Sequence, residues 1–153
     1  MYKLYITNNN DTKTLLSTIL KEEYNLTNYE IYFNEYNKPY LKDINIYFNI
    51  SHDKDKTVLV ISDKEIGVDI EYYTYKSSVV NKYFNEKEQK IVNEAYNKEL
   101  EFTKIWVMKE SFVKMKGIGL SFGLKNVDTT LLRDQIDIKQ EKEYIIAICR
   151  SEE

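Results

Sequence analysis

Several short runs in the first part of the chain alternate hydrophobic and polar residues, which is typical of strands with one buried face. The N-terminal run YKLYIT (2–7) is the first of them, and YEIYF (29–33) is another. Between them, the apolar residues of DTKTLLSTILKEEY (11–24) recur at helical spacing, and Asp11 or Thr12 can cap this helix at its start. The opening of the chain therefore predicts a strand, a helix and a strand.

The next segment contains three further strand-like runs, NIYFNIS (45–51), TVLVIS (57–62) and EIGVDIEY (65–72). They follow NEYNKPYL (34–41), which holds the only proline and predicts a turn. Because the connections between the three runs are short and polar, we expect an antiparallel meander.

The apolar spacing becomes helical in the second part of the chain. SSVVNKYF (77–84) and NEKEQKIVNEAY (85–96) predict two short helices, and a longer helix is expected over residues 99–116. KNVDTTLL (125–132) and EYIIAICR (143–150) then return to strand-like patterns. This order of elements predicts the α+β class of fold.

Length and composition are those of a folded domain. A chain of 153 residues can bury a core of its own, and its fourteen tyrosines and six phenylalanines argue against disorder. We expect a single domain over residues 1–153, which could also consist of two small halves, about 1–62 and 63–153, that share the core. The formal net charge of −3 argues against nucleic acid as a partner of the whole protein.

The sequence also bears on cellular location. Cys149 is the only cysteine, so no intramolecular disulfide can form, which fits a reducing compartment. The N-terminus has no apolar signal core, and no apolar run approaches the roughly 20 residues that span a bilayer. We therefore expect a cytoplasmic protein without a membrane partner.

The strand at 65–72 carries the first candidate chemistry. Because side chains alternate along a strand, Asp69 and Glu71 share one face. Unpaired carboxylates at this spacing raise each other's pKa and weaken the fold, whereas a hard cation such as Mg²⁺ reverses that effect. The alternative is a solvated strand face, on which acidic residues cost little.

The long helix adds a second pair of charges. Trp106, Glu110 and Lys114 follow each other at intervals of four residues and form one stripe beside the apolar face. An ordinary Glu–Lys pair on a surface helix has the same spacing, although the tryptophan on the stripe makes a fully exposed face less expected. Both interpretations stay open at this point.

The single histidine, His52, follows Ser51 at the end of a predicted strand, near Lys54 and Lys56, where a phosphate could be received. A surface histidine is the alternative. One histidine and one cysteine provide no nucleophile triad and no zinc cluster, and the sequence has no P-loop. Carboxylates, lysines and one histidine remain, which are the parts of a Mg²⁺-assisted reaction at phosphorus.

Five blocks of the sequence, in this order, resemble the signature series of the 4′-phosphopantetheinyl transferases, in particular the Sfp-type branch. The blocks are NKP (37–39), FNISHD (48–53), IGVDIE (66–71), YFNEKE (83–88) and FTKIWVMKESFVKMKGIGLSF (102–122). The resemblance implies two similar α+β halves packed as a pseudo-dimer, with the active site in the seam between them.

The resemblance also implies an activity, the Mg²⁺-dependent transfer of 4′-phosphopantetheine from coenzyme A to a serine of an apo carrier protein with release of 3′,5′-ADP. By this similarity, Asp69, Glu71 and Glu110 would hold Mg²⁺. Lys114 would neutralise the phosphate and protonate the departing ADP oxygen. The serine proton would go to Glu110 directly or to Glu88 through a water molecule, and the sequence leaves this choice open.

The same similarity implies contacts to coenzyme A. Ser51 and His52 would meet the 3′-phosphate, with Thr14 near it, and Lys38-Pro39 would form the turn on the adenine side. Trp106 would support Glu110 from behind. An acyl or peptidyl carrier protein would be the second partner. A monomer would suffice because both halves lie in one chain, and a homodimer is the alternative.

The chain departs from the family pattern in two places. Only the polar residues TNNND separate the first predicted strand from the first helix, where Sfp-type relatives carry lysines and arginines that grip the 3′-phosphate. Ile118 also replaces a basic residue often found between the two glycines. These departures lead to an alternative function, a catalytically weak or inactive module that binds coenzyme A or a carrier protein. A phosphohydrolase is a third possibility, and the type of carrier stays open.

Overall fold

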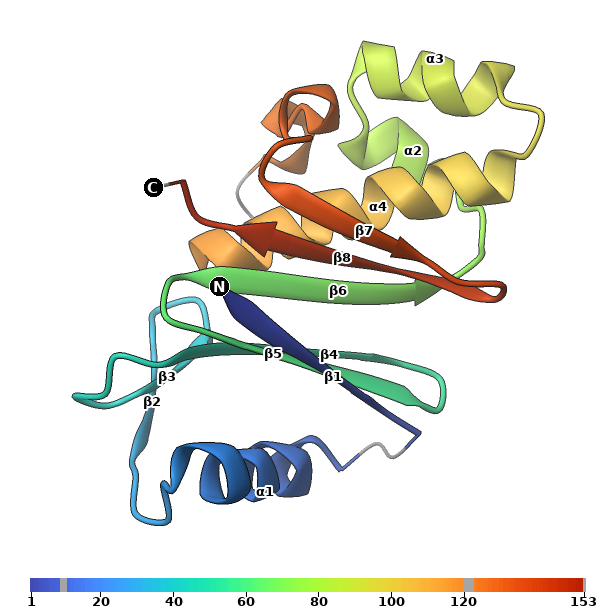
Figure 1. Ribbon diagram of the computed structural model, residues 1–153. Helices are drawn as coiled ribbons and strands as arrows, with labels where there is room; N and C mark the ends of the chain where they lie inside the picture. Colours follow the sequence, from blue (N-terminus) through green and yellow to red (C-terminus); the bar gives the residue numbers. More distant parts are fainter. Residues whose placement is uncertain (9–10, 120–122, 153) are drawn as a thin grey trace.

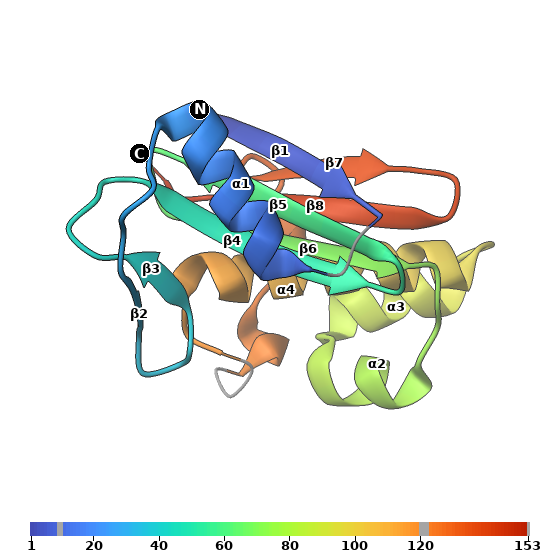
Figure 2. The same ribbon diagram turned by 90° about the horizontal axis from the view of Figure 1, so that it is seen from below.

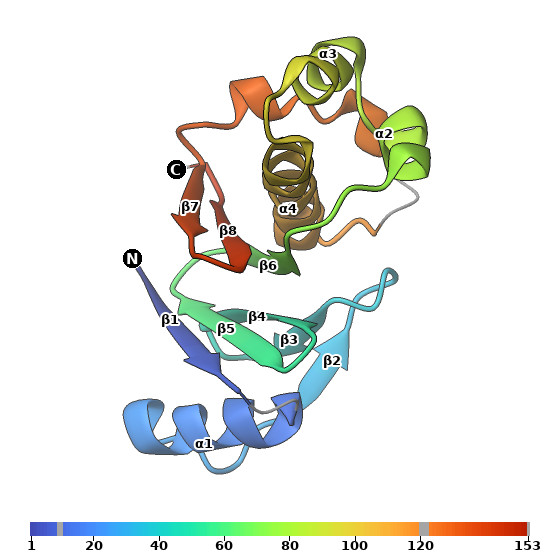
Figure 3. The ribbon, with the colours of Figure 1, turned by 90° about the vertical axis from the view of Figure 1, so that its right-hand side faces the viewer.

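Two antiparallel sheets of three strands each lie face to face in the computed structural model, which describes residues 1–8, 11–119 and 123–152 (Figure 1). Each sheet carries a helix on its outer face, as the end-on view shows most clearly (Figure 3). The elements of the described ranges therefore form four layers, in the order helix, sheet, sheet, helix. This arrangement confirms the α+β class predicted from the sequence.

The first sheet has the strand order β1-β5-β4, and α1 crosses its outer face (Figure 2). Leu16 and Leu20 of this helix pack against Phe48, Leu59 and Ile61 of the sheet. A small two-stranded sheet, β2-β3, follows α1 in the chain. The bounds of these elements are β1 Tyr2–Thr7, α1 Thr12–Tyr24, β2 Ile31–Phe33, β3 Pro39–Leu41, β4 Tyr47–Asp53 and β5 Lys56–Ser62.

The second sheet has the strand order β6-β8-β7, and α4 packs on its outer face, where Val107 and Met115 contact Ile145 and Ala147. Two short helices, α2 and α3, extend beyond α4 (Figure 1). The bounds are β6 Ile66–Tyr72, α2 Ser77–Tyr83, α3 Glu86–Glu94, α4 Lys98–Lys116, β7 Ile136–Gln140 and β8 Tyr144–Arg150, with two 3₁₀ turns, η1 Leu124–Asn126 and η2 Thr129–Leu131.

The inner faces of the two sheets share a core. Val58 and Val60 of the first sheet meet Val68, Ile70 and Ile146 of the second, and all five side chains are buried. β5 is apolar on both faces, because Val58 and Val60 face this shared core while Leu59 and Ile61 face α1. In β6 only one set is aliphatic, since Val68 and Ile70 face the core and Asp69 lies on the other face. The assignment of one domain with halves at 1–62 and 63–153 stays a prediction.

The expected meander is wrong at its third strand. β4 and β5 pair as an antiparallel hairpin, but β6 pairs with β8 and not with β5. The reason is that β1 occupies the second edge of β5, from Tyr2 opposite Ser62 to Thr7 opposite Thr57. β6 therefore begins the second sheet.

The strand expected over KNVDTTLL is also wrong. These residues form η1, η2 and the turn between them, in which the Asp128 side chain accepts hydrogen bonds from the backbone and the hydroxyl of Thr130. Such short side-chain contacts favour turns over strands. One of the two edge strands of the second sheet is β7, which the sequence analysis missed, and the predicted turn around Pro39 contains the short strand β3. No described helix has both the length and the apolar character to cross a membrane.

Candidate functional site

Asp69 and Glu71 lie on the face of β6 that is turned toward α4, and a glycine brings the helix close to this face. A Cβ atom at Gly67, on the same face, would lie 2.1 Å from the carbonyl oxygen of Ser111 and 2.3 Å from the backbone nitrogen of Met115. The helix backbone therefore fills the space that any side chain at residue 67 would need. This close approach places Glu110 and Lys114 of α4 beside the acidic residues of β6.

Asp69 is the buried centre of the site, with 5% of its surface exposed. Its Oδ1 atom accepts hydrogen bonds from Lys114 Nζ at 3.1 Å and from Ser51 Oγ at 2.9 Å. Its Oδ2 atom is buried and has no hydrogen-bond partner among the residues that the structure describes. Burial raises the pKa of Asp69, and the nearby Lys114 and Ser51 act in the opposite direction. One oxygen of this carboxylate is thus bound by donors, and the other lacks a partner.

Glu71 and Glu110 complete an acidic cluster around Asp69. Burial raises the pKa of both to about 7, and the charge of Asp69 is the second cause in each case. The charges of Asp53 and Glu110 raise the pKa of Glu71 further. The three carboxylates are therefore close enough to disfavour each other's ionised form, which Lys114 offsets only in part.

The chemistry of this cluster fits a divalent cation. No group of three His, Cys, Asp or Glu side chains in the described ranges could hold a metal ion as it stands, and Lys114 occupies one oxygen of Asp69. The unpartnered Oδ2 atom of Asp69 and two carboxyl groups with raised pKa are nevertheless the oxygen ligands that Mg²⁺ prefers. Gathering them around one ion requires the side chains to shift.

Aromatic rings form a wall beside Glu110 on α4. Trp106 is half-buried, and its ring lies 5.7 Å from that of Tyr83 and 6.5 Å from those of Phe84 and Phe102. The stripe of Trp106, Glu110 and Lys114 is thus a boundary between this aromatic cluster and the acidic one, and not an exposed helix face.

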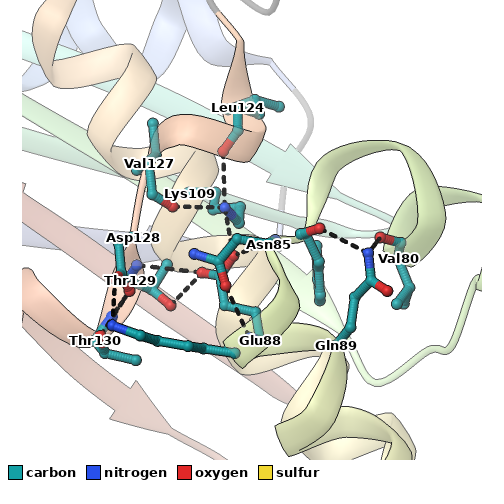
Figure 4. Close-up of polar contacts among 12 residues, drawn as sticks. Val80, Asn85, Glu88, Gln89, Lys109, Leu124, Val127, Asp128, Thr129 and Thr130 are labelled. Carbon is teal, nitrogen blue, oxygen red and sulfur yellow. Dashed lines mark hydrogen bonds and ion pairs between the residues drawn. The ribbon is translucent and has the colours of Figure 1, made fainter.

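Glu88, the second predicted proton acceptor, lies in a closed network of its own (Figure 4). Its side chain is fully buried. Oε1 lies 2.7 Å from Lys109 Nζ and accepts a hydrogen bond from the backbone of Asn85, and Oε2 accepts bonds from the backbone and hydroxyl of Thr129. Both oxygens are thus occupied by structural partners, which does not favour proton transfer through this residue.

Lys109 is the counterpart of Glu88, and the sequence analysis missed it. Its ammonium is fully buried and also donates to the carbonyl oxygens of Leu124 and Val127 at 2.7 and 2.6 Å (Figure 4). Burial lowers the pKa of Lys109, and Glu88 counteracts this. The pair ties α3 and α4 to the segment that contains η1 and η2. The only feature of the sequence that could have indicated a buried Lys109 is its position as a charged residue inside an otherwise apolar stretch of helix.

Lys38, predicted to contact coenzyme A, is occupied as well. The residue is 7% exposed, and its ammonium donates to Glu65 at 2.6 Å, to the carbonyl of Met115 at 2.9 Å and to that of Ile66 at 3.3 Å. Burial lowers the pKa of Lys38, and Glu65 acts against this. Lys38 therefore joins the β2-β3 segment to the end of α4 and the start of β6, while Pro39 begins β3.

The remaining predicted contacts to coenzyme A differ in exposure. Ser51 is buried and faces Asp69, so it belongs to the acidic cluster, whereas His52 and Thr14 are exposed. Thr14 donates to the capping residue Asp11. The structure thus brings together five of the predicted site residues and keeps Glu88 and Lys38 in separate contacts. The five are Ser51, Asp69, Glu71, Glu110 and Lys114.

Fold and site together define an α+β protein with an acidic, lysine-containing centre between a strand and a helix. The model of the 4′-phosphopantetheinyl transferase superfamily matches residues 65–150. These residues contain the second sheet, α4 and the three carboxylates of the acidic cluster. The chain therefore belongs to the 4′-phosphopantetheinyl transferase superfamily.

Individual members of the superfamily show similarity over most of this chain. The 4′-phosphopantetheinyl transferase Sfp of Bacillus subtilis (strain 168) is 33% identical over 132 residues, which cover 82% of this chain and 59% of the relative. The transferase ffp of Bacillus subtilis is 33% identical over 126 residues, 78% of this chain and 56% of the relative. The transferase gsp of Aneurinibacillus migulanus is 34% identical over 118 residues, 71% of this chain and 49% of the relative. The chain thus spans about half the length of the curated relatives it matches.

Proposed function

We propose that this protein transfers the 4′-phosphopantetheine group from coenzyme A to a serine hydroxyl of an apo acyl or peptidyl carrier protein in a Mg²⁺-dependent reaction. Membership of the superfamily supports this activity. The observation that carries it is the Asp69 carboxylate, which shares one oxygen with Lys114 and leaves the other buried without a partner. A cation would supply the missing partner of Oδ2, and a phosphate group would be a further partner for Lys114.

In this proposal, Asp69, Glu71 and Glu110 hold the cation. When bound, Mg²⁺ would neutralise the diphosphate of coenzyme A and polarise the phosphorus–oxygen bond that breaks. The carboxyl groups of Glu71 and Glu110, whose pKa lies at about 7, are largely ionised at slightly alkaline pH, which is the form that a cation requires.

The proton transfers fall to the two charged residues of α4. The serine oxygen forms a bond to the pantetheine phosphorus, and the bond from this phosphorus to the bridging oxygen breaks. Glu110 accepts the proton of the serine hydroxyl. Lys114 donates a proton to the departing oxygen, so that 3′,5′-ADP leaves. Glu88 is assigned no proton, because its two oxygens are engaged by Lys109, Asn85 and Thr129.

The proposal also includes the cellular location, the oligomeric state and the residues that contact coenzyme A. We assign a cytoplasmic location, which the free and buried thiol of Cys149 fits. A monomer is sufficient, because the strand and the helix that carry the acidic cluster belong to one chain. Because Ser51 faces Asp69, we assign it to the support of the cation site and not to coenzyme A contact. His52 and Thr14 remain the proposed contacts to the 3′-phosphate of coenzyme A.

The proposal is tested by incubating the protein with coenzyme A, Mg²⁺ and a panel of apo carriers from fatty-acid, polyketide and nonribosomal-peptide systems, followed by mass spectrometry of each carrier. We expect at least one carrier to gain the mass of phosphopantetheine, and omission of Mg²⁺ or the change Glu110→Ala to abolish the gain. No gain with any carrier, together with no binding of coenzyme A, would contradict the proposal.

A second candidate function is a module that binds coenzyme A or a carrier without turnover. The observation that favours it is the burial of Lys38, which removes a cation from the expected coenzyme A site. Binding of coenzyme A that needs no Mg²⁺ and is unchanged by Glu71→Gln would support this function. Release of free phosphopantetheine without any acceptor would instead identify a phosphohydrolase.

A further inference from the structure

β6 carries two acidic residues of the site, and among the residues that the structure describes, one of its edges has no strand partner. In the order β6-β8-β7 it is an edge strand, paired through its other edge with β8. The N–H groups of successive residues in a strand point to opposite edges, so every second residue directs its N–H group to the open edge and a row of donors lies there. Buried donors of this kind need acceptors from elsewhere in the molecule.

Side chains of β4 supply these acceptors. The backbone N–H of Val68 donates to Asn49 Oδ1 at 2.9 Å, and the N–H of Ile70 donates to Ser51 Oγ at 3.4 Å. The third bond runs from the N–H of Tyr72 to Asp53 Oδ2 at 2.8 Å. Each bond joins residues 19 apart in sequence. The constant separation means that β4 and β6 run in the same direction in fixed register.

This ladder of side-chain oxygens differs from ordinary strand pairing, because β4 contributes no backbone group to it. Asn49 and Ser51 are 6% exposed, so the first two rungs are shielded from water. Asn49 and Ser51 lie opposite Val60 and Val58 in the register with β5, which places them on the inner face of their sheet. The ladder thus joins the two sheets at the border of the shared core.

The turn after β4 holds the end of β6 by two further contacts. Tyr72, the residue after Glu71, donates its hydroxyl to Asp55 Oδ1 at 2.8 Å. The ammonium of Lys54 lies 4.5 Å from the centre of the same ring. Asp53, the last residue of β4, also accepts the backbone N–H of Tyr72, so three consecutive residues contact Tyr72. Lys54 is therefore engaged next to the site, although the sequence had suggested it as a phosphate contact.

Ser51 has a second role, which selects one oxygen of Asp69. Its hydroxyl has one proton, which goes to Asp69 Oδ1, and it accepts the N–H of Ile70 with a lone pair. Since Lys114 binds the same Oδ1 atom, both donors are on one side of the carboxylate. The Oδ2 atom is left for another partner.

We propose that Asn49, Ser51 and Asp53 form a positioning ladder that fixes Asp69 and Glu71 for the cation and that Ser51 directs Oδ2 of Asp69 toward it. Asp69 lies between the first and second rungs and Glu71 between the second and third. Fixing the three N–H groups therefore fixes the backbone on both sides of each acidic residue. The catalytic meaning of the ladder rests on the proposed function, but the ladder itself can be measured without activity.

The first test uses backbone amide exchange, measured by NMR on the full chain without metal. Asp53→Ala is expected to speed exchange at Tyr72 about two- to tenfold, and Ser51→Ala at Ile70 by a similar factor, since each removes one hydrogen bond. Asp53→Asn retains an acceptor oxygen and is expected to keep the exchange rate at Tyr72 close to that of the wild type. Unchanged exchange at Tyr72 in Asp53→Ala would overturn the ladder.

The second test measures divalent cation affinity by calorimetry with Mn²⁺ and Mg²⁺, and the Mg²⁺ dependence of transfer. We expect Asp53→Ala to weaken the cation affinity about tenfold, to leave the KM for coenzyme A unchanged, and Asp53→Asn to restore the affinity. If Asp53→Asn is as defective as Asp53→Ala, the charge of Asp53 and not its acceptor oxygen is what matters, and the positioning role is refuted. The positioning role would also be refuted if the KM for coenzyme A and the cation affinity changed by equal factors and both changes scaled with a loss of stability.

The two proposals can fail separately. If the wild-type protein transfers nothing to any carrier, the proposed function fails, while amide exchange and cation affinity still decide on the ladder. If transfer occurs and the Asp53 and Ser51 variants match the wild type in exchange, affinity and rate, the ladder fails and the proposed function stands.

Discussion

Replacing Glu71 by glutamine is expected to make the metal-free protein more stable and to remove its response to Mg²⁺. Glu71 is held in the acidic cluster by burial beside Asp69, Asp53 and Glu110, which raises its pKa from 4.5 to about 7. A change of this size costs the folded state about 3 kcal/mol once the group is ionised. Because Glu71 is partly exposed, solvent screening lowers this cost to about 1–2 kcal/mol.

The sign of the pH dependence follows from the raised pKa. Below pH 4.5 the carboxyl group is protonated in the folded and the unfolded protein, so it adds no cost. As the pH rises from 4.5 to about 7, the unfolded protein ionises freely while the folded protein resists, and the free energy of unfolding falls. The cost is complete above pH 7. Glu71→Gln, which cannot ionise, should therefore gain stability over the wild type across this pH range.

The assay is thermal unfolding at a series of pH values between about 4 and 8.5, with and without Mg²⁺. At pH 8 the variant is expected to melt about 2–8 °C higher than the metal-free wild type, given about 2–4 °C per kcal/mol for a chain of this size. Mg²⁺ at about a hundred times its Kd should stabilise the wild type by about 2.7 kcal/mol and the variant far less.

A matched control and a clear refutation are available. Glu22→Gln removes an exposed carboxylate from α1 and is expected to change neither the pH dependence nor the response to Mg²⁺. The account would be refuted if Glu71→Gln melted no higher than the wild type at pH 8, or if Mg²⁺ stabilised both proteins equally.

Three further substitutions test other parts of the account. Lys114→Ala is expected to lower the transfer rate more than tenfold while calorimetry shows cation affinity nearly intact, and equal losses of both would make Lys114 a structural residue. Lys109→Met should lower the free energy of unfolding in urea by about 3–5 kcal/mol, because it leaves the Glu88 carboxylate buried without its counter-charge, and a loss below about 1 kcal/mol would contradict this. Gly67→Ala should displace α4 and reduce both stability and cation affinity, since its Cβ would meet the Ser111 carbonyl at 2.1 Å, and wild-type behaviour would refute the close approach.

The acidic cluster could be predicted because its geometry is local in the sequence. Strand alternation places Asp69 and Glu71 on one face, and helical spacing places Glu110 and Lys114 on one stripe. The resemblance to a family then related the strand to the helix. The structure supports the proximity of these residues through the hydrogen bond between Lys114 and Asp69 and the raised pKa of Glu71 and Glu110.

Contacts that depend on distant parts of the chain could not be predicted. The sequence suggests Glu88 and Lys38 as site residues. In the structure Glu88 forms an ion pair with Lys109 and Lys38 forms one with Glu65, and no spacing rule identifies these partners. The role of Ser51 was missed for the same reason, because its partner Asp69 lies on the other sheet.

The errors in the fold have similar causes. The connection from β5 to β6 looks like a hairpin, and only the pairing of β1 with β5 shows why it is not one. In the 125–132 segment, contacts between Asp128 and Thr130 outweigh a weak strand pattern, and the strand β7 is short, with Ile136 and Ile138 as its only apolar residues.

The most direct test of the account is the location of the cation itself. Crystals grown with Mn²⁺ and coenzyme A, measured at the manganese absorption edge, would reveal the ion by its anomalous signal. We predict a single strong peak between β6 and α4, bound by Asp69 through Oδ2, by Glu71 and by Glu110, with the diphosphate of coenzyme A as a further ligand. A peak elsewhere, or Glu110 turned away from an ion held by other residues, would contradict the assignment of Asp69, Glu71 and Glu110 as the cation ligands.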